Sequence, residues 1–347
     1  MIANRLYGIK DLRLEDMSMP SLKEDEVLVK VRACGICGSD VNRYFKNGTY
    51  HYPTTLGHEF AGEVVKVFSD ADDCLLGKRV GIFPLKPCFK CEQCKKGNYE
   101  LCGNYDYLGS RCDGGFAQYV AVPKWNLIEL PDNVSYEQGA MLEPASVGLH
   151  VLKKIEGFQG ENILITGPGP IGIILGNIAK IKGAGKVVLV GRSNEKLDFA
   201  AKNGIDHTLN FNDSDLDAKL KEITEGRGFK FGLEGTGAES CINFLLDRIE
   251  AEGTIVLYGN PHDDVAVKKD SYWKILRKQL TLKGTWNSSF GGLNNEWEEI
   301  LGMIALGRLN LSPLITHRLP LESLREGLEK MNDRNCFTCK VMIASND

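Results

Sequence analysis

Four cysteines in the first third of the chain lie close enough in sequence to bind one metal ion together. They are Cys88, Cys91, Cys94 and Cys102, in the segment PCFKCEQCKKGNYELC. Four thiolates carried by one irregular loop suit a tetrahedral Zn²⁺ with no open coordination position, which is typical of a structural site. Binding of the ion would also replace the hydrophobic core that such a loop lacks. The spacing therefore predicts a structural zinc site, with an iron–sulfur cluster or a set of free thiols as the alternatives.

A second group of metal-binding residue types is dispersed along the chain. Its members are Cys37 in GICGSD, His58 and Glu59 in GHEF, and Glu143 in LEPAS. One thiolate, one imidazole and one or two carboxylates would make a catalytic Zn²⁺ site that leaves room for water or substrate. Taken singly, each residue also has a structural interpretation, as a core thiol, a strand-edge histidine or an acid at a helix N-terminus. Cys34 and Cys37 have the spacing of a redox pair, but no thioredoxin-like βαβ pattern follows them.

The sequence GPGPIG at residues 167–172 matches the G-x-G-x-x-G fingerprint of dinucleotide-binding proteins. It follows the apolar strand NILIT and opens a helix, which is the context that the fingerprint requires. Gly167 permits a tight turn, Gly169 lets the backbone approach a pyrophosphate, and Gly172 lets the helix pack closely on the strand. We therefore expect a dinucleotide at this turn, with a purely structural glycine turn as the alternative.

The end of the next predicted strand bears on which dinucleotide binds. An NAD-dependent enzyme places Asp or Glu there, against the ribose 2′-hydroxyl. Here the position is Gly191, followed by Arg192, so no carboxylate repels a 2′-phosphate and a guanidinium is present to pair with one. We expect NADP to be favoured over NAD; the alternative is that Arg192 stacks on adenine and NAD is still accepted. The residues predicted to bind the cofactor are Gly167, Gly169, Pro170, Ile171, Gly172, Gly191, Arg192, Ser193, Lys196 and Tyr258.

Length and composition limit the classes of protein that this chain can belong to. A length of 347 residues suggests about two domains. Lys and Arg total 42 against 46 Asp and Glu, and this acidic balance argues against a nucleic-acid partner, even for the lysine-rich cysteine loop. Eleven cysteines cannot all pair, and the N-terminus has no apolar signal core, so clustered cysteines indicate metal ligands. No apolar run is long enough to span a membrane, and we expect a cytoplasmic protein.

The elements that must position these residues follow two patterns. Up to about residue 130, β-rich runs such as residues 25–36 and 57–68 alternate with glycine-rich breaks, which predicts a small all-β domain. From residue 161, the apolar strands NILIT, KVVLVG, FKFGLEGTG and GTIVLYG alternate with helical segments. That alternation predicts βαβ crossovers and a parallel sheet. The chain then continues with the helical segments EWEEILGMIALG and LESLREGLEKM and the strand CFTCKVMIA.

Together, the cysteine loop, the GHE segment and the nucleotide fingerprint make the chain resemble the zinc-dependent medium-chain alcohol dehydrogenases, from about residue 25 to 343. The resemblance implies an α/β protein with a GroES-like β domain and a Rossmann domain, which is a doubly wound parallel sheet. The GroES-like catalytic domain would comprise residues 1–147 and 286–347, and the Rossmann dinucleotide-binding domain residues 148–285. FKNGTYHYPTTLGHEFAG, YDYLGSRCDGGFAQY and KILRKQLTLKG are most similar to the polyol-phosphate branch, the galactitol-phosphate dehydrogenases.

The resemblance also implies roles for individual residues. Cys37, His58 and Glu143 would bind a catalytic zinc, with Glu59 adjacent and able to coordinate in some states, in addition to the structural zinc, giving two per chain. Ser39 would be the first proton acceptor, and Ser39 and Glu59 are the predicted catalytic residues. These enzymes often carry a histidine five residues after the catalytic cysteine. Here that position is Asn42, so the proton must leave through Ser39 and water or by another route.

The implied reaction is hydride transfer between NAD(P) and a secondary alcohol of a polyol phosphate, galactitol 1-phosphate being oxidised to a ketohexose phosphate. The alternatives are an unphosphorylated polyol or diol, L-threonine, or a non-catalytic nucleotide sensor, against which the retained metal-binding residues argue. A phosphorylated substrate needs an Arg or Lys to bind its phosphate, and Arg111, Lys46 and Arg43 are available, although solvated surface charge is the alternative for each.

The expected partners are a small-molecule substrate and further copies of the chain. The family implies a homodimer or homotetramer formed through an edge of the nucleotide-domain sheet, with no nucleic-acid or membrane partner. The remaining cysteines receive no chemical role. Cys34, Cys74, Cys112 and Cys241 are interpreted as packing residues, and Cys336 and Cys339 are left unassigned.

Overall fold

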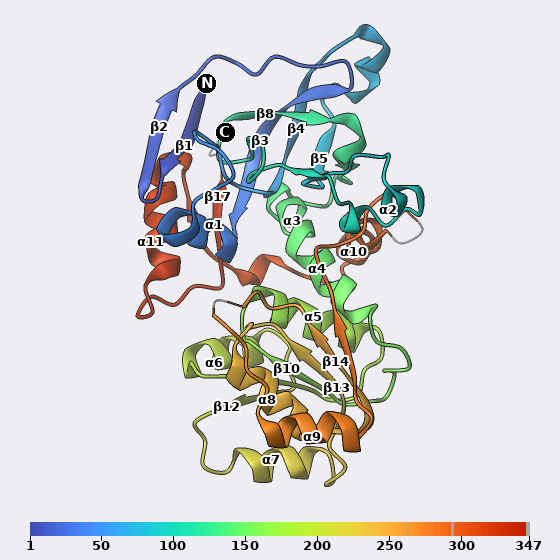
Figure 1. Cartoon of the computed structure of the whole chain (residues 1–347). Coiled ribbons are helices and arrows are strands. Elements are labelled where there is room, and N and C mark those ends of the chain that lie inside the picture. The colour runs from blue at the N-terminus through green and yellow to red at the C-terminus, as the bar shows by residue number, and fades with distance from the viewer. Residues whose placement is uncertain (262, 293–294, 345–347) are drawn as a thin grey trace. The chain divides into compact units, whose positions relative to one another are not determined.

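The computed structural model describes residues 1–261, 263–292 and 295–344, and the chain divides into two compact units (Figure 1). The first unit comprises Met1–Ser146 and Ser288–Asp347, and the second comprises Val147–Asn287. Relative to the predicted boundaries, Val147 and residues 286–287 fall in the second unit. Each unit has a hydrophobic core of its own. Within the described ranges, we find no helix that combines the length and the apolar character needed to cross a membrane.

The first unit is built on a seven-stranded sheet of order β16-β17-β3-β4-β5-β9, with β8 paired to β3 outside this path. The pairing is antiparallel except between β16 and β17. Residues 26–36 form the long central strand because EVLVKVRACGI is rich in β-branched side chains that pack on both faces. The strands are β3 Glu26–Ile36, β4 Glu59–Val67, β5 Arg79–Ile82, β8 Tyr119–Pro123, β9 Leu127–Glu129, β16 Ile315–Leu319 and β17 Lys340–Ala344.

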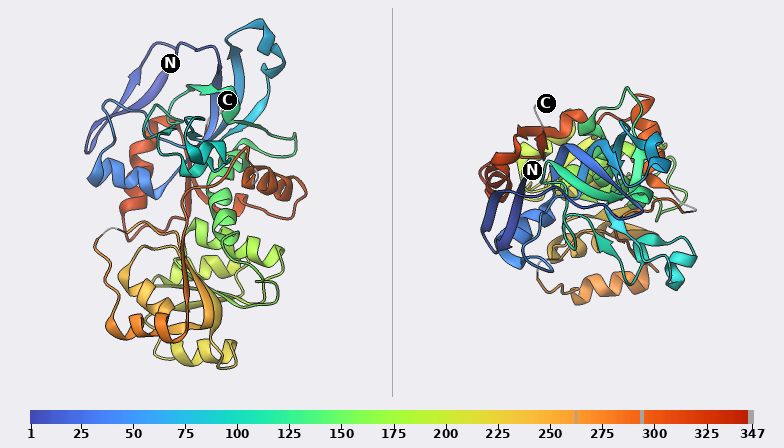
Figure 2. Two further views of the ribbon diagram at one scale, coloured as in Figure 1. Left: turned by 45° about the vertical axis from the view of Figure 1, so that its right-hand side comes forward. Right: turned by 90° about the horizontal axis from the view of Figure 1, so that it is seen from above.

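A β-hairpin, a second short strand pair and several short helices surround this sheet. Figure 2 shows the hairpin beside α11, from which Arg325 donates to the Leu12 carbonyl. The Asn4 side-chain amide donates to the carbonyl of Leu321, just before this helix. The strands are β1 Ile2–Gly8, β2 Asp11–Asp16, β6 Leu85–Lys86 and β7 Asp106–Tyr107. The helices are α1 Gly38–Asn42, η1 Arg43–Asn47, η2 Asp70–Leu75, α2 Glu92–Lys95, η3 Tyr99–Leu101, η4 Lys124–Asn126, α3 Tyr136–Ala140, α10 Glu296–Ala305, η5 Ser312–Leu314, η6 Leu321–Ser323 and α11 Leu324–Asn332; α4 Leu142–Leu152 begins in this unit and ends in the second.

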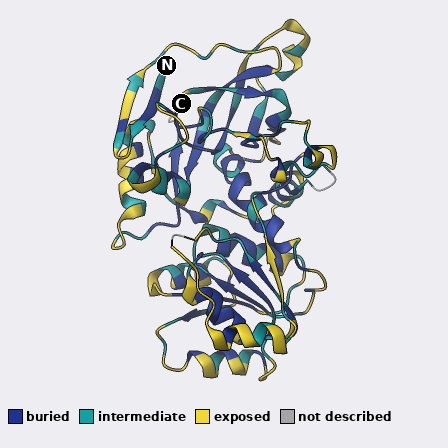
Figure 3. Cartoon of the chain, in the orientation of Figure 1, coloured by how far each residue is buried: buried dark blue, intermediate teal, exposed yellow. Residues whose placement is uncertain are grey.

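The second unit is a six-stranded parallel sheet of order β12-β11-β10-β13-β14-β15. The order reverses between β10 and β13, and ligands of such sheets bind at the carboxyl ends of the strands where this reversal occurs. In Figure 3 the central strands are buried, and α7 and α9 expose their outer faces. The strands are β10 Ile163–Thr166, β11 Val187–Gly191, β12 His207–Asn210, β13 Phe229–Glu234, β14 Ile249–Leu257 and β15 Thr281–Gly284, and the helices are α5 Pro170–Ile181, α6 Asn194–Lys202, α7 Leu216–Ile223, α8 Glu239–Arg248 and α9 Lys269–Arg277.

The predicted strands NILIT, KVVLVG, FKFGLEGTG and GTIVLYG correspond to β10, β11, β13 and β14. The prediction of a parallel sheet with helical crossovers is confirmed. Four elements of this unit were not predicted, namely β12, β15, α7 and α9. β12 has only four residues, HTLN, and all four residues of β15 are exposed, so neither carries the apolar signal by which a buried strand is recognised.

Candidate functional site

The four cysteines of the loop at residues 88–102 converge on one point. Cys91 precedes α2, Cys94 lies within α2 and Cys102 follows η3, so two short helical turns bring the thiols together. All four sulfur atoms lie within 4.8 Å of one another, with separations of 3.5 Å from Cys91 to Cys94 and 3.9 Å from Cys91 to Cys102. A tetrahedron of sulfurs about 2.3 Å from a zinc ion has edges of about 3.8 Å. The donor set therefore fits a four-coordinate zinc ion.

The backbone of this loop prepares one of its thiols for metal binding. N–H groups directed at the Cys91 sulfur, that of Cys94 foremost, lower the pKa of this thiol to about 6. A metal ion binds the thiolate rather than the thiol, so these contacts favour the form that binds. The arrangement is what a structural metal site requires.

An aromatic cluster attaches the cysteine loop to the rest of the first unit. Phe89 and Tyr99 of the loop stand edge-to-face on Trp125, with ring centroids 5.0 and 5.1 Å away. Trp125 contacts Phe290 in turn at 5.2 Å, edge-to-face. Such ring pairs contribute about 0.5–1.5 kcal/mol each beyond the area that they bury. The loop is thus held by aromatic packing, which the spacing of its four cysteines does not reveal.

Strand pairing brings the second group of predicted metal-binding residues together. Cys37 follows the end of β3, and Glu59, the first residue of β4, lies opposite Gly35 of β3, directly after His58. One ligand atom from each of Cys37, His58 and Glu59 lies within 4.8 Å of the others. A side chain at Gly35 would place its Cβ 2.2 Å from Glu59 Oε2, so the glycine allows the carboxylate to lie against the backbone. Sulfur, nitrogen and oxygen donors at these separations fit a catalytic zinc ion.

Glu143 is held at the same place by a tyrosine. Its carboxylate, near the start of α4, accepts a hydrogen bond of 3.2 Å from the Tyr107 hydroxyl. The Tyr107 ring also packs edge-to-face on His58, with centroids 5.8 Å apart. Burial raises the pKa of Glu143 to about 7, although the charge of His58 acts to lower it. Glu143 is not within 4.8 Å of all three other ligand atoms, so the structure places it beside the group of Cys37, His58 and Glu59.

A buried lysine neutralises Glu59. Lys340, the first residue of β17, donates to Glu59 Oε1 at 2.7 Å, to Oε2 at 2.5 Å, and to the carbonyl of Ile36 at 3.3 Å. The Lys340 and Glu59 side chains are 3% and 2% exposed. Lys340 reaches this position because β17 pairs with β3 antiparallel, Val341 lying opposite Ile36. The three ammonium donors are therefore all used.

Asp40 supports the other two members of the group. It is fully buried, accepts a hydrogen bond of 3.0 Å from the Cys37 N–H, and places Oδ1 3.6 Å from His58 Nδ1. Burial acts to raise the pKa of Asp40, but His58 and the Cys37 N–H outweigh it and lower the pKa. At 3.6 Å the contact between Asp40 and His58 is electrostatic and not a hydrogen bond.

The sequence did not single out Asp40, Tyr107 or Lys340. Lys340 has one recognisable signal, because it is the only charged residue in the strand KVMIA and a lysine in an apolar strand requires a buried partner. Asp40 stands three residues after Cys37, where a carboxylate can accept from the N–H of the residue before the helix. Nothing local identifies Tyr107, whose two partners lie far from it in sequence.

The remaining predicted residues of the first unit have different surroundings. Ser39 lies half-buried in α1, within the turn that follows Cys37, and Lys46 is exposed. Arg111 lies over two tyrosine rings, 4.5 Å from Tyr50 and 4.3 Å from Tyr105, and donates to the Tyr105 carbonyl at 3.3 Å. Its guanidinium therefore binds two segments of this unit to each other.

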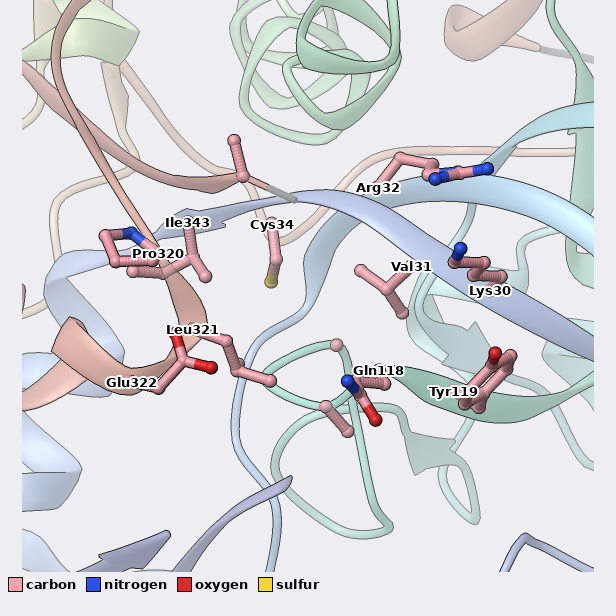
Figure 4. Close-up of a pocket in the computed structure, with 13 residues that line it drawn as sticks. Lys30, Val31, Arg32, Cys34, Gln118, Tyr119, Pro320, Leu321, Glu322 and Ile343 are labelled. Atoms are coloured by element: carbon pink, nitrogen blue, oxygen red, sulfur yellow. The ribbon is translucent and has the colours of Figure 1, made fainter. Parts of the chain in front are cut away.

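A separate pocket of about 300 Å³ lies at β3, β8 and the segment around residue 321 (Figure 4). Its polar lining includes Lys30, Arg32, Tyr119 and Glu322. None of the predicted site residues lines it. The residues predicted to carry out the reaction therefore lie outside this pocket.

In the second unit two of the three fingerprint glycines, Gly167 and Gly172, occupy positions that exclude a side chain, and the third lies in open space. Gly167 has φ of +104°, in the left-handed region that favours glycine. A Cβ at Gly172 would lie 2.2 Å from the Gly167 carbonyl oxygen, so this glycine lets α5 pack against the turn. Gly169, directly before Pro170 and Ile171 of α5, has open space where its side chain would stand. The turn thus leaves room for a phosphate group at the start of α5.

The glycine-rich turn at residues 167–172 limits which side chain fits at the end of β11. A Cβ at Gly191 would lie 2.5 Å from Pro168 Cγ, so the proline ring fills the space of a side chain at position 191. Arg192 is exposed and donates to the Ser240 hydroxyl at 3.1 Å, and Ser193 accepts from the Lys196 N–H at 3.4 Å as the N-cap of α6.

Tyr258 follows β14 and covers the backbone next to this turn. A Cβ at Gly235 would lie 2.2 Å from the Tyr258 hydroxyl, so the tyrosine packs directly on the chain at the end of β13. Burial raises the pKa of Tyr258. With the fingerprint and the residues after β11, it borders the carboxyl ends of the central strands, where a dinucleotide would bind.

A cysteine–histidine–glutamate group in one unit and a doubly wound parallel sheet in the other are the arrangement expected of a metal-dependent dehydrogenase. Comparison with known proteins identifies the family. Residues 23–132 match the alcohol dehydrogenase GroES-like domain, and residues 170–305 match the zinc-binding dehydrogenase domain. The chain is 37% identical over 344 residues to galactitol 1-phosphate 5-dehydrogenase of Escherichia coli strain K12, covering 99% of each. It is 31% identical over 331 residues to L-threonine 3-dehydrogenase of Pseudoalteromonas atlantica, covering 94% of this chain and 95% of that one.

Solved structures agree with these sequence matches. The crystal structure of galactitol-1-phosphate dehydrogenase from Escherichia coli has a TM-score of 0.92 at 36% identity, covering 99% of this chain and 100% of that one. A protein of Sinorhizobium meliloti 1021 assigned as a zinc-binding dehydrogenase, solved with NADP, has a TM-score of 0.90 at 28% identity, covering 99% of each. The chain belongs to the family of zinc-dependent medium-chain alcohol and polyol dehydrogenases. The predicted family and the predicted fold class, a GroES-like domain with a Rossmann sheet, are confirmed.

Proposed function

We propose that this protein oxidises a secondary alcohol of a polyol phosphate to the ketose phosphate, with galactitol 1-phosphate as the substrate and NADP favoured over NAD. The observation that carries the proposal is the 37% identity to galactitol 1-phosphate 5-dehydrogenase across 99% of both chains. The convergence of Cys37, His58 and Glu59 supports a catalytic rather than a sensory role. The 11 cysteines form no disulfide, which agrees with a protein that acts in the reducing cytoplasm.

The proposed chemistry assigns each residue of the site a task. Cys37, His58 and Glu143 would hold the catalytic zinc, with Glu59 adjacent and able to coordinate in some states. Cys88, Cys91, Cys94 and Cys102 would hold a second, structural zinc. The catalytic zinc would supply Lewis acidity, lowering the pKa of an alcohol near it. Ser39 accepts the hydroxyl proton and passes it to water, since Asn42 has no titratable group. A dinucleotide held at the glycine turn of residues 167–172 would supply the acceptor for the hydride that leaves the alcohol carbon as this carbon becomes a carbonyl.

Two features of the second unit support the preference for NADP. Pro168 occupies the space beside Gly191, so no acidic side chain stands where it would repel a 2′-phosphate. Arg192 and Ser193 follow directly and offer a guanidinium and a hydroxyl to such a phosphate. The NADP-bound relative from Sinorhizobium meliloti is a precedent for this cofactor in a similar fold.

Initial rates of cofactor reduction by zinc-replete protein test the proposal. Galactitol 1-phosphate, galactitol, sorbitol and L-threonine are each compared with NADP⁺ and NAD⁺ at matched concentrations. The expected result is the highest kcat/KM with galactitol 1-phosphate and NADP⁺. A higher value for L-threonine would favour the activity of the relative that is 31% identical. Absence of any rate, with zinc bound, would favour a nucleotide sensor.

We further propose that two copies of the chain associate through β15, the edge strand of the second unit. All four of its residues are exposed, and an exposed strand edge presents unpaired backbone groups to another strand. Large apolar side chains lie close by in sequence, with Trp286 51% exposed and Tyr272 of α9 54% exposed. Leu282→Lys, in the strand itself, should therefore convert dimers or tetramers to monomers in sedimentation velocity. A wild-type protein that sediments as a monomer would refute this assembly.

A further inference from the structure

Arg43 is a partly buried residue whose guanidinium has no hydrogen-bond partner among the described residues. Its Nη1 atom is buried and makes no hydrogen bond, and the guanidinium forms no ion pair with any described residue. The other arginines in the described ranges either donate to a protein acceptor or are exposed on the surface. Removing a guanidinium from water without a partner is unfavourable, and an added acceptor recovers that free energy. Arg43 thus has donors available for a bound anion.

Its position relates it to the metal-binding residues. Arg43 begins the π-helical turn η1 Arg43–Asn47, which continues directly from α1, and such turns are frequent at functional sites. The Arg43 N–H donates to the carbonyl of Ser39, so these two residues stand one helical turn apart on the same face. Cys37 directly precedes the same helix. A single short segment therefore carries a predicted zinc ligand, the predicted proton acceptor and the unpaired guanidinium.

Electrostatics place the positive charge near the site as well. The charge of Arg43 acts to lower the pKa of Asp40, which supports His58, and that of Tyr107, which holds Glu143. Both effects are secondary to burial and to nearer groups. The positive charge of Arg43 therefore acts on Asp40 and Tyr107, which contact the predicted zinc ligands. Among the described residues, Arg43 nevertheless forms no ion pair with Asp40.

The two other candidate cations are less suitable. Arg111 is already engaged by the rings of Tyr50 and Tyr105 and by a backbone carbonyl. Lys46 lies in the same turn as Arg43 but is exposed, where its charge is solvated. A planar guanidinium also matches the geometry of a phosphate group with two parallel hydrogen bonds, which an ammonium does not.

We infer that Arg43 is the residue that binds the phosphate group of the substrate and so makes the enzyme prefer a polyol phosphate to the free polyol. This inference rests on the proposed function and names the residue responsible for its specificity. With the reacting carbon beside Cys37 and Ser39, a chain of several carbons extends along the helix, and its phosphate reaches Arg43. The loss of Arg43 should then affect only substrates that carry a phosphate.

The test compares wild type, Arg43→Gln, Arg43→Lys and Lys46→Gln, each with galactitol 1-phosphate and with galactitol. Zinc per chain is measured for every variant, so that a loss of metal is recognised. Inorganic phosphate is also titrated as an inhibitor of galactitol oxidation. For Arg43→Gln we expect the ratio of kcat/KM values, phosphorylated over free, to fall roughly 10- to 100-fold, mainly through KM. Arg43→Lys should recover part of this ratio, and Lys46→Gln should retain it.

Inhibition by phosphate should weaken by a similar factor in Arg43→Gln, a change that a purely structural role of Arg43 would not produce. Equal losses on both substrates would overturn the inference, because they would mean that Arg43 acts through Asp40 and His58 instead. That result leaves the proposed function standing as long as the wild type prefers galactitol 1-phosphate. A wild type that ignores the phosphorylated substrate and is not inhibited by phosphate would overturn both.

Discussion

Replacing Lys340 by methionine should strongly destabilise the first unit. Methionine keeps most of the length of the side chain but removes the charge that contacts both oxygens of Glu59. Because the Glu59 side chain is only 2% exposed, water cannot take the place of the ammonium group. Removing one partner of a buried ion pair costs about 3–5 kcal/mol. We therefore expect the free energy of unfolding to fall by about that amount.

A set of variants isolates the contribution of the Lys340–Glu59 ion pair to stability. Denaturant unfolding is followed for wild type, Lys340→Met, Glu59→Gln and the double variant by tryptophan emission, to which the fully buried Trp297 of the first unit contributes. The double variant replaces both charges, so it should lose less stability than the sum of the two single variants. Lys95→Met is the matched control, because its partner Glu92 and Lys95 itself are 77% and 62% exposed and no change is expected.

The pair also predicts a response to pH. Burial acts to lower the pKa of Lys340, but the charges of Glu59 and Cys37 outweigh it and raise the pKa above its ordinary value. The ion pair's contribution to the free energy of unfolding is therefore complete below the pKa of an unfolded lysine, about 10.4. It is lost as the pH rises through the higher pKa that Lys340 has in the folded protein. The double variant should lack this alkaline loss. The reasoning is refuted if Lys340→Met unfolds like the wild type, or if the two single effects simply add.

Three further predictions concern separate parts of the molecule. Cys91→Ser should reduce bound zinc by one ion per chain and lower the melting temperature by roughly 5 °C or more; unchanged zinc content would argue against a metal in that loop. Gly191→Asp alone should impair binding of either cofactor, because its Cβ meets Pro168 at 2.5 Å. Combined with Pro168→Ala it should shift the NADP⁺ to NAD⁺ ratio of kcat/KM at least roughly tenfold toward NAD⁺, and an unshifted ratio would exclude a role for this position. Burial raises the pKa of Cys112 to about 11, so iodoacetamide at pH 8 should label the exposed Cys74 and spare Cys112, as peptide mass spectrometry would report.

The residues that sequence reasoning located best are those whose partners lie close by in the chain. Cys88 and Cys102 lie 14 positions apart, so their spacing alone limits the loop geometry. The glycines of residues 167–172 are likewise fixed by one turn between a strand and a helix. Local spacing carries this information because the chain between the residues is too short to take many paths.

Residues whose partners are distant in sequence were missed for the converse reason. Lys340 and Glu59 are 281 positions apart, and only the pairing of β17 with β3 brings them together. Tyr107 meets Glu143 across 36 positions through two elements whose packing no local pattern specifies. The absence of a partner for Arg43 is a further case, since a sequence shows that an arginine exists but not that every nearby acceptor is already used.

The position of β17 also has a consequence for how the protein is made. The second unit is continuous in sequence, so a ribosome delivers all of it before β17 exists. Until β17 is made, β3 lacks its antiparallel neighbour on that side, and the Lys340 ammonium then reaches the Ile36 carbonyl across 304 positions. Until then Glu59 lacks the ammonium group that neutralises it in the folded protein. The buried Lys340–Glu59 ion pair can therefore form only after the whole of the second unit has been synthesised.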